Sequence, residues 1–463
     1  PFATVGHAMS NMNDNDWILV APGAYQESLS AYETNGFLFG IGGMDSTFIT
    51  GSDQNRTMEV NNASWMIGGI TFSGGATDGD GGAIKIENGG LMLGGARFAN
   101  NTALMLGGAI CAKNANVMMD SVFFVNNHCL EGDGGALFIE NNHSDENREV
   151  VIINTLFAEN TAAIGSGAGA KIVSINDAIT SVYLDSVNFY QNEAYVYAGF
   201  QLYGGVYCDI NNSQFIGNQA QAYSAAGGFS GGSNLNMEYC LIAGNQANLG
   251  GGTANSGGFS VWSGSYGHFN NCTFTGNSAE FGSALTVGGG SYAFFDASIV
   301  WNNPGDNALA AVHWDDNGST LDVYNSVVQG GESGMYADDL SYINQDGVLD
   351  MDPFFCDPEN GDFSIDLLSY AVTPWGDPMG ALGYGCEGTI MASATIVSVE
   401  DVPNDQGGRV YITFEKSLFD TDGLSRTEMY TVERMDGDQW VGLTSVGAYS
   451  SEVYVVEVTT LSD

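Results

Sequence analysis

Basic residues are scarce in this chain. Its 463 residues include 10 lysines and arginines against 54 aspartates and glutamates, which gives a formal net charge of -44. No lysine or arginine occurs between Lys171 and Arg409. Nucleic acids and anionic membranes are bound through basic surfaces, so both are excluded as partners. Cations, neutral glycans and other proteins remain, and the simplest role of the charge is to keep a strand-rich surface soluble.

Long apolar runs are also missing, and prolines are few. No run of about 18 apolar residues occurs, so the sequence predicts no membrane-spanning segment. The 65 glycines against 8 prolines lack the triplet period of collagen, and a hydrophobic content of 44% excludes a disordered chain. The chain starts at Pro1 instead of methionine, so we expect a processed or partial product.

Cysteine and histidine are too few for a stapled miniature fold or an obvious metal centre. The odd number of seven cysteines leaves at least one free or joined to another chain. Cys129, Cys240 and Cys272 are interpreted as small core residues, and free thiols are favoured over a 240–272 disulfide because stacked side chains point the same way. No Cys-x-x-Cys or paired histidine spacing is present, which argues against zinc.

A repeated phrase dominates what is present. An aromatic or aliphatic residue stands three places before an asparagine, and a small residue stands two places after it. The copies are Phe98/Asn101/Ala103, Phe124/Asn127/Cys129, Phe157/Asn160/Ala162, Phe189/Asn192/Ala194, Phe215/Asn218/Ala220, Ile242/Asn245/Ala247 and Phe274/Asn277/Ala279, with a looser one at Ile299/Asn302 and a degenerate one at Phe72/Gly75. Successive asparagines lie 25 to 33 residues apart, and periods of about 20 to 50 residues are typical of solenoids.

Each repeat has the composition of one coil of parallel strands. A coil must turn three times, and asparagine and glycine tolerate the left-handed backbone that turns require. We expect the phenylalanines of successive coils to stack in one ladder and the asparagines in another, with each amide bonded to the next. Shorter strands are expected earlier, at 36–40, 46–50, 57–60 and 64–72, with a capping turn at 8–12.

Two further sets of motifs carry a family resemblance. Glycine pairs follow the asparagine phrases, at Gly81-Gly82-Ala83-Ile84, Gly107-Gly108-Ala109-Ile110, Gly134-Gly135-Ala136-Leu137, Gly227-Gly228-Phe229 and Gly257-Gly258-Phe259. With Phe-x-x-Asn they resemble the repeats of chlamydial polymorphic outer membrane proteins and related bacterial adhesins. Asn15-Asp16 and Pro22-Gly23-Ala24-Tyr25 resemble the opening segment of the pectate-lyase-like superfamily. The resemblance implies an all-β, right-handed parallel β-helix of roughly ten or more coils.

The pattern changes after the repeats. The phrases Asp-Pro-Phe-Phe-Cys356-Asp-Pro and Gly-Ala-Leu-Gly-Tyr-Gly-Cys386 resemble the closing segment of secreted bacterial β-helix proteins. This resemblance implies a Cys356–Cys386 disulfide and an oxidising, exported location. Beyond it, antiparallel strands are expected at 396–399, 410–414, 428–434, 440–443 and 453–458. Residues 401–414 resemble the start of a fibronectin-type-III-like module, which would be truncated here to a partial β-sandwich.

Four regions follow from these patterns. The N-terminal cap and first coils occupy 1–75, the parallel β-helix repeats 76–349, the closing segment 350–388 and the fibronectin-type-III-like module 389–463. Extra length at 141–149, 195–207 and 250–262 marks where loops are expected to bind ligands. Candidates for a sugar-stacking platform, against the alternative that they only pack, are Tyr195, Tyr197, Tyr203, Tyr207, Tyr223, Trp262 and Tyr266.

Signals for metals and catalysis are weak. Calcium candidates are Asp78, Asp80 and Asp133, and Leu106 takes the equivalent place in the coil between them, so the two acid groups cannot share an ion. The adjacent aspartates Asp315-Asp316 and Asp338-Asp339 are the pairs available to a glycoside hydrolase, and solvated turns are the better interpretation. A polysaccharide lyase lacks the basic residues that it needs. No catalytic residue, and no cofactor other than calcium, is predicted.

The expected function is therefore structural or adhesive. We expect a non-catalytic protein, exported to the cell surface or extracellular space, in which a rigid β-helix displays loops. Its expected partners are copies of itself, surface glycans or other proteins. The alternative is a glycan-binding module or a polysaccharide-degrading enzyme, lyase or glycoside hydrolase, on the same fold.

Overall fold

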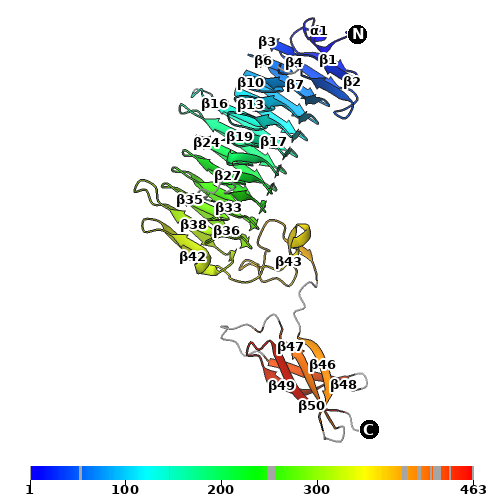
Figure 1. The fold of residues 1–463 in the computed structure, drawn as a ribbon, viewed down its shortest axis with the longest axis vertical. Coiled ribbons are helices and arrows are strands. Elements are labelled where there is room, and N and C mark those ends of the chain that lie inside the picture. Colours follow the sequence, from blue (N-terminus) through cyan, green and yellow to red (C-terminus); the bar gives the residue numbers. More distant parts are fainter. Residues whose placement is uncertain are drawn as a thin grey trace. The chain divides into compact units, whose positions relative to one another are not determined.

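The computed structural model describes residues 2–51, 55–144, 146–247, 256–387, 394–403, 408–417, 420, 429–436 and 439–460. Two compact units are formed. The first comprises Pro1–Pro353, Phe363–Ile365 and Tyr370–Gly383, and the second Phe354–Asp362, Asp366–Ser369 and Tyr384–Asp463. The first unit is a parallel β-solenoid of about twelve turns, seen in Figure 1 as a stack of strands that runs from blue to yellow. The predicted all-β solenoid is confirmed, whereas the right-handed coil stays a prediction.

The largest sheet of the solenoid has two columns of stacked strands. The first column holds β3 (Leu29–Tyr32), β6 (Met58–Asn61), β16 (Leu137–Asn141), β20 (Ala170–Ser174), β24 (Phe200–Gly204), β28 (Gly227–Ser230), β32 (Phe259–Val261), β35 (Leu285–Gly288), β38 (Leu309–Val312) and β41 (Met335–Ala337). The second column holds β1 (Asp16–Val20), β4 (Gly36–Gly40), β7 (Ser64–Gly68), β17 (Arg148–Ile153), β21 (Thr180–Asp185), β25 (Val206–Asn211), β29 (Asn234–Glu238), β33 (Tyr266–Asn270), β36 (Tyr292–Asp296), β39 (Thr320–Tyr324) and β42 (Tyr342–Asp346). Strands β10 (Ile84–Gly94) and β13 (Ile110–Asp120) run through both columns.

Two further parallel sheets complete the coil, one along its whole length and the other, of seven strands, along its middle turns. One contains β2 (Gly23–Gln26), β5 (Thr47–Thr50), β8 (Thr71–Ser73), β11 (Arg97–Ala99), β14 (Phe123–Val125), β18 (Leu156–Ala158), β22 (Asn188–Tyr190), β26 (Gln214–Ile216), β30 (Leu241–Ala243), β34 (Thr273–Thr275), β37 (Ile299–Trp301) and β40 (Val327–Val328). The other contains β9 (Ala76–Thr77), β12 (Thr102–Ala103), β15 (His128–Cys129), β19 (Thr161–Ser166), β23 (Glu193–Val196), β27 (Gln219–Tyr223) and β31 (Gln246–Ala247). The apolar core lies inside the coil, because alternate residues of each strand point inward.

The predicted phenylalanine ladder is confirmed. Phe124, Phe157 and Phe189 are fully buried, and their rings stack with centroid distances of 4.8 and 4.9 Å. The stack extends on both sides, through Phe98 to Phe72 and to Phe215. One large apolar side chain per turn therefore fills the centre of the coil.

The predicted asparagine ladder is also confirmed. The Asn192 Oδ1 accepts hydrogen bonds from the backbone N–H (3.1 Å) and the Nδ2 (3.0 Å) of Asn160. The Asn192 Nδ2 donates in turn to Asn218 Oδ1 (3.0 Å) and to the Phe157 carbonyl (2.9 Å). The same pattern links Asn101, Asn127, Asn160, Asn192, Asn218, Asn245, Asn277 and Asn303, all completely or largely buried. The asparagines are structural groups that satisfy buried backbone atoms.

In three places the structure differs from the predicted pattern in local detail. The ladder continues at Asn303 instead of Asn302, because the left-handed residue directly precedes the ladder asparagine and Asn302 fills that place (φ 56). The pair Gly227-Gly228 lies inside β28, and the left-handed turn before it is at Ser224. The expected strand at 64–72 is two strands, β7 and β8, separated by a turn at the left-handed Gly69.

A short helix covers the first turn of the solenoid. The predicted capping turn lies slightly earlier than expected, as α1 (Val5–Met9), and buries Val5 and Met9. Glu27 accepts hydrogen bonds from the N–H groups of Val5 and Gly6 at 2.8 and 2.7 Å. In the described residues no helix is long and apolar enough to cross a membrane.

The closing segment contains the expected disulfide, Cys356–Cys386, and the other five cysteines are buried free thiols, Cys129, Cys240 and Cys272 among them. Its elements are β43 (Phe355–Asp357), η2 (Pro358–Asn360), β44 (Asp362–Asp366) and β45 (Tyr384–Cys386), whereas η1 (Gly331–Gly334) lies earlier, between β40 and β41 of the solenoid. Part of it packs against the solenoid, since the Ala381 N–H donates to Thr273 Oγ1 at 2.9 Å.

The C-terminal strands form two antiparallel sheets. All five strands expected there are present, as β46 (Thr395–Asp401), β47 (Arg409–Glu415), β48 (Met429–Asp436), β49 (Gln439–Gly447) and β50 (Val453–Thr459). Strands β46, β47 and β50 form one sheet, and β48 and β49 form the other. Residue 428, the start of one predicted strand, and residues 404–407 of the fibronectin-like motif lie outside the described residues.

A buried carboxylate holds these C-terminal sheets together. Asp420 is 3% exposed and accepts hydrogen bonds from the hydroxyls of Tyr454 and Tyr430 and from the Ser450 N–H. Burial alone would raise the pKa of Asp420, but these donors outweigh burial and lower it. A carboxyl group with a lowered pKa in the folded state stabilises that state above its unfolded pKa of about 3.9.

Acidification is therefore expected to loosen the C-terminal sheets. As pH falls below about 4, protonation of Asp420 removes the stability that its anion provides. Hydrogen exchange of the β47 and β50 amides, corrected for intrinsic rates, should show this loss in the wild type. Asp420→Asn should be less stable at neutral pH and show a smaller further loss in acid. Equal acid-induced losses in both proteins would contradict this assignment.

Candidate functional site

Four aromatic side chains surround a hollow of about 330 Å³ on the outside of the solenoid. We call this hollow the aromatic groove. It is lined by Tyr197, Tyr223, Trp262 and Trp314, together with Ser230 and Ser263. Trp314 is 64% exposed and Tyr223 43% exposed, so aromatic surface is open to solvent. Aromatic faces flanked by hydroxyl groups suit a ligand with both apolar and hydroxyl-bearing surfaces.

Glycines create the space in which the two tryptophans meet. Trp262 directly follows β32, and Trp314 lies two turns further along the stack, after β38. The turn between them carries Gly288-Gly289-Gly290. A Cβ atom at Gly288 would lie 2.4 Å from the Trp262 ring. Because no side chain intervenes, the rings of Trp262 and Trp314 approach edge to face with centroids 6.4 Å apart.

Tyr197 enters the groove from a strained turn. Its φ of 54° places it in the left-handed region, where the equivalent residue one turn earlier is Gly167 (φ 64). The cost of this backbone is about 1–3 kcal/mol for a bulky residue, and such positions cluster at functional sites. The ring lies against Gly228, and the hydroxyl hydrogen-bonds Ser260. Burial raises the pKa of Tyr197, with the Ser260 hydrogen bond opposing, so the phenol is neutral at physiological pH.

The structure brings together only part of the platform predicted from sequence. Tyr197, Tyr223 and Trp262 line the aromatic groove, and Trp314 was missed. The other candidates do not line it, although Tyr195, Tyr203, Tyr207 and Tyr266 are exposed by 48%, 46%, 53% and 43%. Tyr266 instead stacks on Tyr292 at 5.3 Å, on the second column. Residues 250–255 of the predicted 250–262 loop lie outside the described residues.

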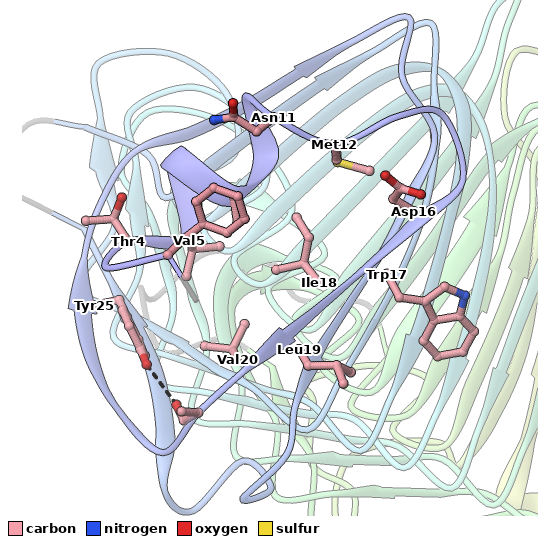
Figure 2. A pocket seen from close by; sticks show the side chains of 13 residues that line it. Thr4, Val5, Asn11, Met12, Asp16, Trp17, Ile18, Leu19, Val20 and Tyr25 are labelled. Atoms are coloured by element: carbon pink, nitrogen blue, oxygen red, sulfur yellow. Dashed lines mark hydrogen bonds between the residues drawn. The ribbon is translucent and has the colours of Figure 1, made fainter.

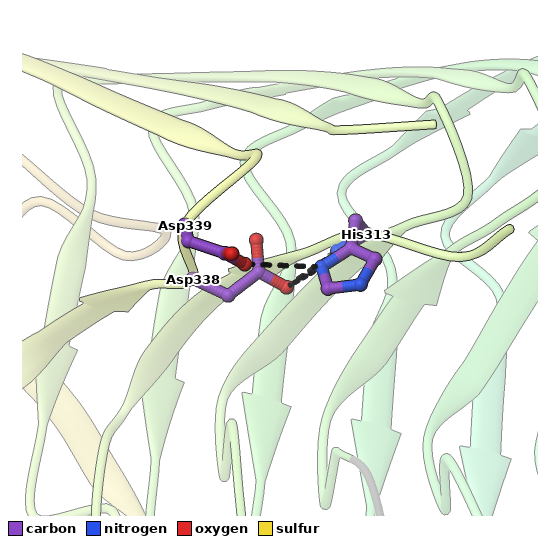
Figure 3. Close-up of side chains that lie close together, drawn as sticks. All are labelled: His313, Asp338 and Asp339. Atoms are coloured by element: carbon purple, nitrogen blue, oxygen red, sulfur yellow. Dashed lines mark hydrogen bonds and ion pairs between the residues drawn. The ribbon is translucent and has the colours of Figure 1, made fainter. Parts of the chain in front are cut away.

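A histidine and two aspartates form a second cluster, shown in Figure 3. The Asp338 Oδ2 lies 2.7 Å from the His313 Nδ1 and also accepts the His313 backbone N–H at 2.6 Å. Asp339 Oδ1 lies 3.8 Å from the same ring nitrogen. Burial would raise the pKa of Asp338, but hydrogen bonds from His313, Ser341 and Leu340 lower it overall. The carboxylate is thus anionic and fixed in place.

The cluster was missed because its members are 25 residues apart in sequence. His313 and Asp338 follow β38 and β41, which pair in parallel with Ala311 opposite Ala337. The register between the two strands is 26 residues, so continuing it places Asp339 opposite His313 and Asp338 one residue before that position. This repeat was the signal that could have found the cluster. Asp315 and Asp316 lie instead in an exposed turn with φ values of 49° and 63°. They are solvated turn residues, as expected.

Two of the calcium candidates already have cationic partners. The Asp80 carboxylate pairs with the Lys113 Nζ at 2.9 Å, and the Asp133 carboxylate pairs with the Lys171 Nζ at 2.9 Å. Leu106 and Asp133 are neighbours in register, as predicted. Burial would raise the pKa of Asp133, but Lys171 and Ser166 lower it overall. Asp78 is exposed, so calcium binding at these residues stays a prediction.

A third feature is a hollow of about 390 Å³ with a mixed polar and apolar lining at the N-terminal cap. Figure 2 shows Val5 and Met12 from the cap near the buried Ile18 and Val20 of β1, while Trp17 and Leu19, which alternate with them along the strand, are exposed. The hollow is bounded by α1 and the first strand of the stack. Its lining combines aliphatic and aromatic side chains with the polar Thr4, Asn11 and Asp16.

Comparison of the chain with protein-family models and with curated proteins finds no match to either.

Proposed function

We propose that this chain is a non-catalytic adhesive scaffold whose aromatic groove binds a neutral glycan. The observation that carries the proposal is the meeting of Tyr197, Tyr223, Trp262 and Trp314 around one open hollow. Sugar rings stack their C–H faces on aromatic rings, and their hydroxyl groups bond to hydroxyls such as those of Ser230 and Ser263.

The charge of the molecule favours an uncharged ligand. No lysine or arginine occurs between Lys171 and Arg409, and the turn beside Trp314 carries Asp315 and Asp316. A polyuronate would be repelled by this acidic surface. A lyase acting on such a polymer is correspondingly disfavoured, because it needs a basic residue to remove a proton beside the uronate carboxylate.

The place of the protein in the cell is part of the proposal. The resemblance of its repeats to those of bacterial adhesins, and of its closing segment to secreted β-helix proteins, supports an exported right-handed β-helix at the cell surface. The Cys356–Cys386 disulfide fits an oxidising compartment. The antiparallel C-terminal strands are consistent with a fibronectin-type-III-like module.

A glycan array followed by calorimetry tests this function. Wild-type protein should bind neutral glycans and leave polyuronates unbound. Trp262→Ala should weaken binding more than tenfold, since losing roughly 100 Å² of stacked ring surface removes about 2.5 kcal/mol. Tyr266→Ala is the matched control, because Tyr266 is an exposed aromatic residue outside the groove. The glycan affinity of this variant should equal that of the wild type. Absence of neutral-glycan binding, or an unaffected Trp262→Ala variant, would contradict the proposal.

A further inference from the structure

The strongest unused chemistry in the molecule is the cluster of His313, Asp338 and Asp339. One nitrogen and two carboxylate oxygens lie within 4.8 Å of one another. They are placed by the same turn of two successive coils, so the backbone ladder between β38 and β41 fixes their spacing. We propose that these three side chains bind a divalent transition-metal ion, with zinc as the best fit. None of these three side chains lines the aromatic groove, although His313 directly precedes Trp314 in the chain.

The ligand spacing fits a tetrahedral ion. With bonds of about 2.0–2.1 Å, a tetrahedral zinc ion holds its ligand atoms about 3.3 Å apart. The observed Asp338–His313 and Asp339–His313 distances of 2.7 and 3.8 Å lie on either side of that value. Small side-chain rotations therefore reach the bound geometry without any change in the backbone.

One ligand is already held in position. The Asp338 side chain is only 14% exposed, and Asp338 Oδ1 accepts the Leu340 N–H at 3.3 Å while Oδ2 accepts the His313 N–H. Hydrogen-bonded carboxylates of this kind keep metal ligands oriented. The side chains of His313 and Asp339 are 38% and 86% exposed, so an ion can enter from solvent and water can complete its coordination.

Two other acids of the solenoid have cationic partners. Asp80 and Asp133 are each neutralised by a lysine. Among the residues that the structure describes, the ion-pair partner of both Asp338 and Asp339 is His313. No lysine or arginine occurs in the sequence between Lys171 and Arg409. Two carboxylates beside one imidazole leave a net negative site, and a metal ion supplies the missing positive charge.

The donor set selects the metal. Imidazole nitrogen together with carboxylate oxygen is typical of zinc and other transition metals, whereas calcium takes six to eight oxygens. When the ion binds, His313 Nδ1 exchanges its hydrogen bond to Asp338 for a bond to the metal.

Zinc titration by calorimetry tests the site, with excess magnesium present to saturate the general acidity of the surface. The wild type should bind one strong equivalent of Zn²⁺ per chain. Asp338→Asn and His313→Gln should each weaken it about 100-fold or more. A protein with both Asp315→Asn and Asp316→Asn is the matched control, because it loses two neighbouring acids outside the cluster, and it should bind as the wild type does.

Cobalt gives a second readout, which reports the ligands and geometry of the bound ion. Co²⁺ added to the wild type should produce the visible absorption bands of a nitrogen- and oxygen-ligated ion, and these bands should disappear in His313→Gln. Strong Zn²⁺ binding that persists in Asp338→Asn, or that is lost equally in the control, would overturn the assignment.

Discussion

Replacing Asn192 with alanine is expected to destabilise the solenoid by about 3–5 kcal/mol. The side chain is fully buried and joins three turns of the coil. Its loss leaves the backbone N–H and Nδ2 of Asn160 without their acceptor and the Phe157 carbonyl without its donor. Each buried polar group left unpaired costs about 1–3 kcal/mol.

Asn188→Ala provides the matched control. Asn188 lies in the same turn, at the start of β22, but its side chain is exposed. This substitution should change the free energy of unfolding by no more than about 0.5 kcal/mol. Urea unfolding followed by circular dichroism measures both variants. If the two variants unfold at the same urea concentration, the ladder does not contribute as described.

Phe157→Ala is the second large expected effect, at about 3–5 kcal/mol. The ring is fully buried between Phe124 and Phe189, with centroids 4.8 and 4.9 Å away. Truncation leaves a cavity at the centre of the coil, where the stacked strands above and below prevent collapse. Phe157→Leu should cost less, about 1.5 kcal/mol or below, because most of the volume is retained.

Phe123→Ala separates burial from loss of an aromatic ring in general. Phe123 directly precedes a ladder residue, but it points outward and is only partly buried, beneath Arg97. Its loss should cost about 1 kcal/mol or less. Equal destabilisation by Phe123→Ala and Phe157→Ala in urea unfolding would show that the ring stack has no special role.

The scaffold could be predicted from the sequence alone because the same residue pattern recurs in successive turns. The residue at the Phe157 position recurs beside an asparagine at the Asn160 position in turn after turn, and parallel stacking puts equivalent residues in contact. Only one arrangement places all these residues inside. The repetition therefore identified both ladders and their contacts before any coordinates were known.

The exact register was harder to predict where either of two neighbouring residues could occupy the same position of the repeat. Trp301-Asn302-Asn303 offers two asparagines, and only the backbone shows that Asn302 is the left-handed residue and Asn303 the ladder residue. At Ser224 a serine takes the left-handed position that glycine fills in turns such as those of Gly107 and Gly134, so the nearby glycine pair does not mark the turn. Spacing in sequence does not resolve such one-residue choices.

The candidate sites were predicted least well, for a physical reason. Trp262 and Trp314 are 52 residues apart in sequence, and their contact depends on the absence of side chains in the turn between them. His313 and Asp338 meet only because β38 and β41 are in register. A site formed by residues of several turns depends on loop lengths and on where side chains are missing. The pattern of a single repeat shows neither.

Our central proposal is that the phenylalanine and asparagine ladders stabilise the scaffold and that the aromatic groove binds the glycan. The glycan affinity of the Gly288→Ala variant tests this proposal most directly. The new methyl group would lie 2.4 Å from the Trp262 ring and push it out of place, whereas at the control Gly94→Ala no atom lies within 4 Å. Calorimetry with the best neutral glycan should show at least tenfold weaker binding for Gly288→Ala, with unchanged unfolding, and wild-type affinity for Gly94→Ala. Wild-type affinity in Gly288→Ala with a displaced Trp262 ring would contradict the account.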